Sequence, residues 1–97
     1  MSERRTEPVK ATHIEDWDEF LKGEVPGAVH LRGDRLWYTC PCGCTANGSL
    51  RVGNGFKPHE SPSWAWNGSL DKPELTPSVH HVGHWHGWLQ GGIWRSV

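Results

Sequence analysis

The sequence predicts a mostly β protein: a small antiparallel sheet or partly open barrel of hairpins with one short N-terminal helix, closed by a Cys/His zinc site. Three observations lead to this prediction. Short aromatic and β-branched segments alternate with Asn-Gly, Gly-Asp and Gly-Gly turn signals. Seven tryptophans accompany only 18 Leu, Val, Ile and Phe residues among 97 positions, so large rings must supply much of the core. All three cysteines lie between Cys40 and Cys44.

Two parts are expected, a polar arm over residues 1–11 and a single zinc-stabilised β domain over residues 12–97. The domain is expected to begin with an amphipathic helix, because Thr12 and Glu15 match a capping box. Its apolar side chains recur at helical spacing: Ile14, Trp17, Phe20 and Leu21. Gly23 is expected to end this helix.

The remainder of the chain is expected to form short strands. Residues 28–40 predict a hairpin that turns at Gly33-Asp34, and its second strand leads directly into the cysteines. Asn47-Gly48 is expected to turn the chain into the next strand. The further strands are expected at residues 49–52, 63–66, 79–82, 84–90 and 93–97.

The cysteine cluster indicates a metal site. Thiols this close cannot form a disulfide framework, but their thiolates can share one soft or borderline metal ion. Residues i and i+2 of a strand point to the same face, so His84 and His86 are expected to add imidazole ligands. Five donors then compete for four positions, and both two cysteines with two histidines and three cysteines with His86 stay open. The predicted ligands are Cys40, Cys42, Cys44, His84 and His86, with zinc as the metal.

The order of four motifs, CPCGC, SWAWNG, LTPSV and HWHGWLQGG, resembles a family of small uncharacterised proteins from bacterial and especially tailed-phage genomes. The resemblance covers about residues 26–95. It implies a zinc-type site that includes the three cysteines and His86. Many relatives carry a cysteine where this chain has Gly83, which leaves the fourth ligand open. Phage members are often labelled ammonia monooxygenase, but cysteine-rich ligation favours zinc or iron over the redox metal of such an enzyme.

These observations predict a small zinc-binding accessory or adaptor protein of phage type. The metal is expected to be structural, and the partner a protein or a second copy paired through sheet edges. An enzyme is not expected, because the zinc-protease helix motif and the zinc-deaminase signature are both missing from the sequence. One alternative is a metal-dependent hydrolase that uses Glu60 or Glu74 as base at an open zinc position.

The second alternative is a nucleic-acid-binding module. Arg32, Arg35 and Arg51 can form a basic strip on neighbouring strands, but a net charge of −1 disfavours this partner. No signal peptide is expected, because residues 1–10 contain no apolar run, and no membrane span is expected, because no run of eighteen apolar residues occurs. Three reduced cysteines therefore predict a cytoplasmic setting, or the host cytoplasm or a virion for a phage protein.

Overall fold

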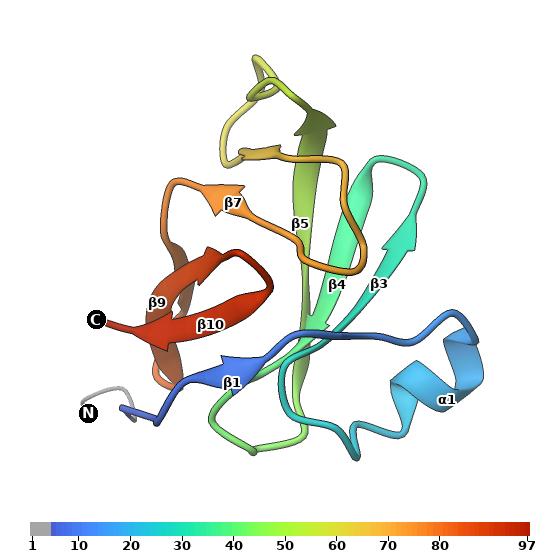
Figure 1. The fold of residues 1–97 in the computed structure, drawn as a ribbon, viewed down its shortest axis with the longest axis vertical. Helices are drawn as coiled ribbons and strands as arrows, with labels where there is room; N and C mark the ends of the chain where they lie inside the picture. Colours follow the sequence, from blue (N-terminus) through green and yellow to red (C-terminus); the bar gives the residue numbers. More distant parts are fainter. Residues whose placement is uncertain (1–4) are drawn as a thin grey trace.

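The computed structural model describes residues 5–97 (Figure 1). Ten strands and one helix are described: β1 (Val9–Lys10), β2 (Thr12–His13), α1 (Trp17–Leu21), β3 (Ala28–Arg32), β4 (Arg35–Thr39), β5 (Asn47–Asn54), β6 (Trp64–Trp66), β7 (Leu75–Thr76), β8 (Val79–His81), β9 (Trp85–Gln90) and β10 (Ile93–Ser96). They form a six-stranded sheet in the order β2-β3-β4-β5-β6-β7 and a four-stranded sheet in the order β1-β10-β9-β8. The predicted fold class, mostly β with one short helix, is confirmed.

The helix is shorter than predicted, and the Thr12 capping box is wrong. Thr12 and His13 instead pair in parallel with Ala28 and Val29 of β3. The Ile14 N–H extends this pairing by donating to the Val29 carbonyl at 3.0 Å. Sheet pairing satisfies backbone groups that a first helical turn would leave unpaired, so this non-local contact overrides the local helix signal.

The cysteine bend connects β4 and β5, as predicted, but Asn47-Gly48 does not form a turn. Both residues belong to β5, and Gly48 lies opposite Tyr38 of β4. A Cβ at Gly48 would lie 2.7 Å from the Tyr38 hydroxyl oxygen. The glycine therefore allows the tyrosine ring to lie over the strand, because glycine in a strand leaves room for a close approach where any side chain would clash.

The predicted hairpin between β3 and β4 is confirmed, with Gly33 at a φ of 58° in its turn. The sheet is not wholly antiparallel, however. β5 and β6 run parallel, with Val52 opposite Trp64, as do β2 and β3. β7 then contacts β9, so the far edge of the larger sheet meets the smaller sheet.

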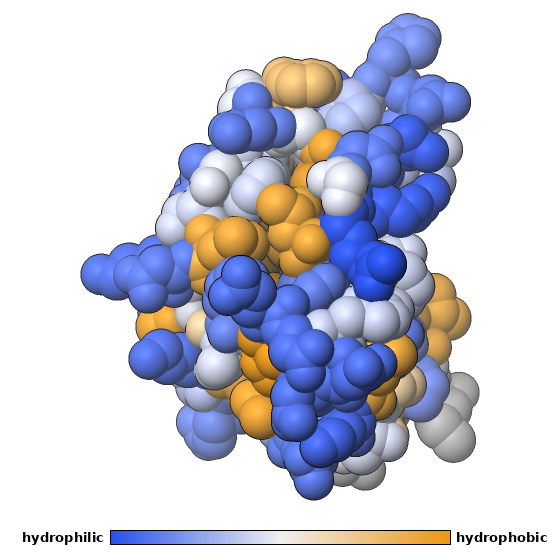
Figure 2. All heavy atoms as spheres, turned by 90° about the vertical axis from the view of Figure 1, so that its right-hand side faces the viewer, coloured by the Kyte–Doolittle hydropathy of each residue, from blue (hydrophilic) through white to orange (hydrophobic). Residues whose placement is uncertain are grey.

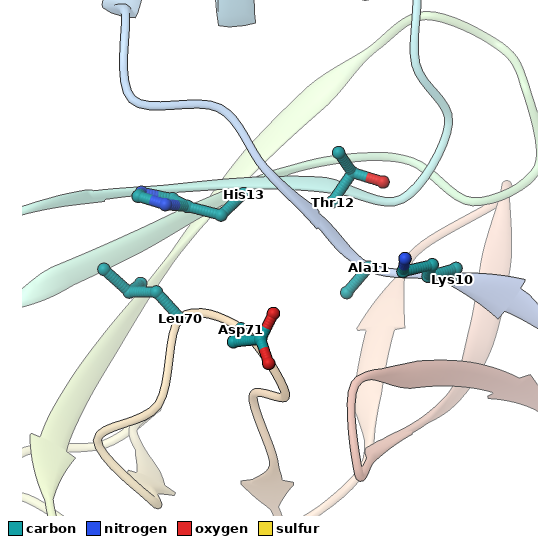
Figure 3. Close-up of a pocket in the computed structure, with 6 residues that line it drawn as sticks. All are labelled: Lys10, Ala11, Thr12, His13, Leu70 and Asp71. Atoms are coloured by element: carbon teal, nitrogen blue, oxygen red, sulfur yellow. The ribbon is translucent and has the colours of Figure 1, made fainter.

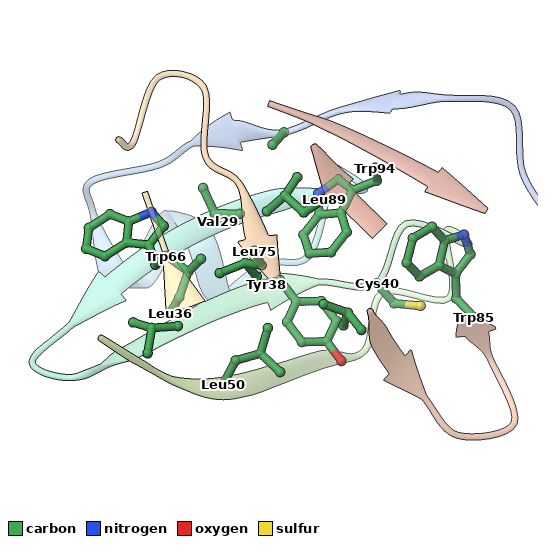
Figure 4. Packing of buried hydrophobic residues seen from close by; sticks show 13 residues of the cluster. Val29, Leu36, Tyr38, Cys40, Leu50, Trp66, Leu75, Trp85, Leu89 and Trp94 are labelled. Atoms are coloured by element: carbon green, nitrogen blue, oxygen red, sulfur yellow. The ribbon is translucent and has the colours of Figure 1, made fainter. Parts of the chain in front are cut away.

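Tryptophan rings fill the core between the sheets, as predicted (Figure 4). Trp85 and Trp94 are fully buried and meet edge to face, with ring centroids 5.6 Å apart. The Trp94 indole N–H donates to the Gly27 carbonyl at 2.9 Å, and that of Trp85 donates to the Thr6 hydroxyl at 3.1 Å. Each buried ring thus has a partner for its polar atom, as a stable aromatic core requires.

Part of the predicted polar arm belongs to this fold. Val9 and Lys10 form β1 and pair with β10, and Ala11 is buried. Residues 1–4 of the predicted arm lie outside the described residues. No helix in the described part of the chain is long and apolar enough to cross a bilayer. The face seen in Figure 2 is mostly hydrophilic, and its apolar side chains lie in separate groups.

Candidate functional site

A serine and a histidine meet where the two sheets join. Ser78 lies between β7 and β8, directly after the Thr76-Pro77 dipeptide, and His86 lies on the neighbouring strand β9. The Ser78 Oγ lies 3.1 Å from His86 Nε2. Both residues are half-buried. The pair is therefore within hydrogen-bond distance and still open to solvent on one side.

Neighbouring rings hold both residues in place. The Trp64 indole N–H donates to the Ser78 carbonyl at 3.0 Å. The ring of His80, which lies opposite His86 in the β8–β9 pair, has its centroid 4.7 Å from that of His86. The Trp88 ring stacks on that of His86, with centroids 6.5 Å apart. Contacts from β6, β8 and β9 thus fix the orientation of the serine and the imidazole.

A serine hydroxyl bonded to an imidazole has a well-defined chemical capacity. A free serine hydroxyl is a weak nucleophile, and an adjacent imidazole activates it by accepting its proton. Sequence reasoning did not single out Ser78. The only available signal was that Ser78 and His86 both lie in motifs that carry the family resemblance, and such pairs are recognised by geometry and not by sequence spacing.

The three cysteines converge as predicted. The Sγ atoms of Cys40, Cys42 and Cys44 all lie within 4.8 Å of one another, and those of Cys40 and Cys42 are 3.2 Å apart. The bend is closed by the Cys40 N–H, which donates to the Ala46 carbonyl at 2.8 Å. Three clustered thiols are a donor set that fits a borderline metal such as zinc, so the cluster is able to bind a metal ion.

The surroundings of the cluster disfavour uncompensated negative charge. Burial raises the pKa of the Cys40 thiol, and the hydrogen-bonded Cys42 thiol adds to this rise. Burial, followed by the charges of Cys40 and Cys44, also raises the pKa of Tyr38 to about 12. A bound cation would compensate the thiolates and reverse this preference.

The two predicted histidine ligands lie outside the group of three thiols. His86 is bonded to Ser78, and the ring of His84 stacks on that of His81 with centroids 4.6 Å apart. The alternation argument fails because β9 begins at Trp85, so His84 is not on the same regular strand as His86.

The residues of the two alternative functions have other partners. Glu60 forms an ion pair with Arg51 at 3.3 Å, and Glu74 accepts a hydrogen bond from the Gly91 N–H at 3.1 Å. The Arg32 guanidinium lies over the ring of Trp17, at 4.2 Å from its centroid. These contacts give the side chains structural roles on the surface.

One cavity of about 230 Å³ lies between the β1–β2 segment and the loop after β6 (Figure 3). Its lining residues are Lys10, Ala11, Thr12, His13, Leu70 and Asp71. None of them belongs to the Ser78–His86 pair or to the cysteine cluster. This cavity is therefore separate from both candidate sites.

The Ser78–His86 contact pairs a hydroxyl with an imidazole, the arrangement that serine hydrolases use for nucleophilic catalysis. A family model described as "Bacterial ubiquitination-like system serine protease (BubE)" matches residues 13–97. The chain belongs to this family. Comparisons with curated proteins and with solved structures gave no match.

This family corrects two predictions. The predicted accessory or adaptor protein of phage type is wrong, because the matched family is a family of bacterial serine proteases. The prediction that the protein is not an enzyme is wrong for the same reason. One predicted alternative was a hydrolase, but a metal-dependent one. The matched family is described as a serine protease, so this alternative had the reaction class right and the catalytic group wrong.

Proposed function

We propose that this protein is a serine protease in which Ser78 is the nucleophile and His86 the general base. Its substrate is proposed to be a peptide or isopeptide bond at the C-terminus of a ubiquitin-like protein in a bacterial ubiquitination-like system. The observation that carries the assignment is the 3.1 Å contact between Ser78 Oγ and His86 Nε2. Family membership supports the reaction class and the cellular system.

The reaction follows from the geometry of the pair. His86 Nε2 accepts the hydroxyl proton while Ser78 Oγ forms a bond to the scissile carbonyl carbon. The carbon–nitrogen bond then breaks, and His86 gives the proton to the leaving amine. A water molecule attacks the acyl group on Ser78, with His86 again accepting a proton, and releases the carboxylate product.

The position of Ser78 also favours one form of substrate. β7 is an edge strand of the larger sheet and β8 an edge strand of the smaller one, and Ser78 lies between them. Edge strands present unpaired backbone groups that an extended peptide can pair with. This arrangement supports an extended tail as the segment that enters the site, and the predicted protein partner is then the substrate.

The test is cleavage of a reporter fused to the C-terminus of a ubiquitin-like protein from the same bacterium. Replacing Ser78 or His86 with Ala should lower kcat/KM by about 10³-fold or more, because the first variant removes the nucleophile and the second removes the base that activates it. The matched control is Ser61→Ala, which changes an exposed serine outside the site and should leave the rate unchanged. Wild-type cleavage by the Ser78→Ala variant would contradict the assignment.

Zinc is the metal that we propose for the three cysteines, with a structural role. Three thiols within 4.8 Å support sulfur ligation, and zinc is the usual metal of cysteine-rich structural sites. Reduced thiols also support a cytoplasmic setting. Elemental analysis of the protein as purified should give about one zinc per chain, and Cys42→Ser should lower this content.

A further inference from the structure

We propose that His81 is the fourth ligand of the metal bound by Cys40, Cys42 and Cys44. This inference rests on the proposed metal site and not on the proposed protease activity. It replaces His84 and His86 with a histidine from β8, the strand that directly follows Ser78. The resulting Cys₃His set is a closed site of the structural type.

The strand register places His81 on the face that meets the cysteine bend. His81 lies opposite Trp85 in the β8–β9 pair, and opposite residues of an antiparallel pair point to the same face. Trp85 is fully buried, and it belongs to the same core cluster as Cys40, with both side chains at one end of that cluster in Figure 4. The side chain of His81 is therefore on the same side of the hairpin as the cluster.

A ring contact supports this placement from the opposite sheet. The ring of Tyr38 meets that of His81 edge to face, with centroids 5.8 Å apart. Tyr38 lies two residues before Cys40, where the chain leaves β4 for the cysteine bend. His81 thus packs against the same part of the larger sheet that holds the first cysteine.

The decisive atom is His81 Nδ1. This nitrogen is buried and has no hydrogen-bond partner among the described residues. Leaving a buried polar group unpaired destabilises the folded state, whereas coordination to a metal satisfies the group. Among the predicted histidine ligands, His86 is bonded to Ser78 and His84 is exposed, so neither presents a comparable atom.

Metal binding requires a small movement. Among residues 5–97, the donor atoms that lie within 4.8 Å of one another are the three thiols alone, so the His81 ring must swing toward them. The connection after β8 contains Gly83, at a φ of 80°, and Val82, which is 76% exposed, and it is closed by the His84 N–H, which donates to the His81 carbonyl at 2.9 Å. Once coordinated, His81 would tie the hairpin that carries Ser78 and His86 to the larger sheet.

Metal binding provides the test without using the protease activity. Purified His81→Ala, His81→Cys and His84→Ala chains are stripped of metal, refolded and titrated with Zn²⁺ against a chelator and with Co²⁺ by visible absorption. His81→Ala should lower the affinity for Zn²⁺ at least about 10-fold. His81→Cys should restore affinity and strengthen the sulfur-to-cobalt charge-transfer bands, because it supplies a fourth thiolate.

The matched control is His84→Ala, which removes the neighbouring stacked imidazole and should bind both metals as the wild type does. Unchanged affinity and cobalt spectra in His81→Ala would overturn the proposal, as would a loss confined to His84→Ala. A wild-type chain that binds neither metal would overturn the metal site as well. Labelling of Ser78 by a serine-reactive probe reports on the protease assignment separately, so the two failures are distinguishable.

Discussion

Replacing Gly87 with alanine tests how the fold positions His86, the proposed general base. Gly87 is buried in β9, directly after His86, and lies opposite Ser96 of β10. A Cβ at this position would lie 2.5 Å from Cη2 of Trp85 and 2.8 Å from the carbonyl carbon of Arg95, with the Arg95 oxygen closer still. Carbon atoms in contact are normally about 3.5–4.0 Å apart, so β9, which carries His86, and β10 must separate by about 1 Å.

Two magnitudes follow from this clash. Overpacking costs about 1–3 kcal/mol, and the upper end applies because the nearest atom is the backbone oxygen of Arg95 and the next belongs to the fully buried Trp85 ring. A displacement of about 1 Å at a catalytic group lowers the rate about 10²-fold. Gly87→Ala should therefore lower the free energy of unfolding by about 3 kcal/mol in urea and slow cleavage about 10²-fold at a temperature where the variant remains folded.

The control for this variant is Gly33→Asn, at the tip of the β3–β4 hairpin. Gly33 has a φ of 58° and nothing within 4 Å of an added Cβ, and asparagine tolerates this conformation. Its free energy of unfolding should change by less than about 1 kcal/mol. If Gly87→Ala were as stable and as active as the wild type, the close packing of β9 against β10 would be refuted.

Three further predictions concern stability. Trp94→Phe should lower the free energy of unfolding by about 2–3 kcal/mol in urea, because it removes buried ring area and leaves the Gly27 carbonyl without its donor. A loss below about 0.5 kcal/mol would contradict the packing described. Arg51→Ala should change the free energy of unfolding by no more than about 1 kcal/mol, because the ion pairs of Arg51 with Asp34 and Glu60 are exposed to solvent. A larger loss would show that these pairs act as a network. A chelator should lower the melting temperature and expose three thiols per chain to a thiol reagent, and an unchanged melt would contradict a structural metal.

Much of the fold could be predicted because the relevant signals are local. The Gly33-Asp34 turn and the strands around it depend on neighbouring residues alone. The predicted Thr12 helix failed because its first residues pair with β3, more than ten positions away. The predicted turn at Gly48 failed because this glycine is required by the ring of Tyr38 on the next strand. Both errors come from tertiary contacts that a local pattern does not contain.

Of the two candidate sites, one could be predicted from local sequence and the other depends on tertiary contacts. The cysteine cluster is contiguous in sequence, and its convergence could be predicted from spacing. Ser78 and His86 are eight residues apart and meet only because β8 and β9 pair. Nothing local distinguishes a serine beside a general base from a serine in a turn. The unpaired nitrogen of His81 likewise cannot be recognised from the sequence, because only the folded structure shows that no donor or acceptor of the described residues reaches Nδ1.

The most direct test of the central claim is covalent labelling with a fluorophosphonate probe, followed by mass spectrometry of the digested protein. An activated serine reacts with such a probe, whereas an ordinary serine does not. We expect a single adduct on Ser78 in the wild-type chain and its loss in the His86→Ala variant. An adduct on a different residue, no adduct, or equal labelling without His86 would contradict the assignment of this pair as the catalytic centre.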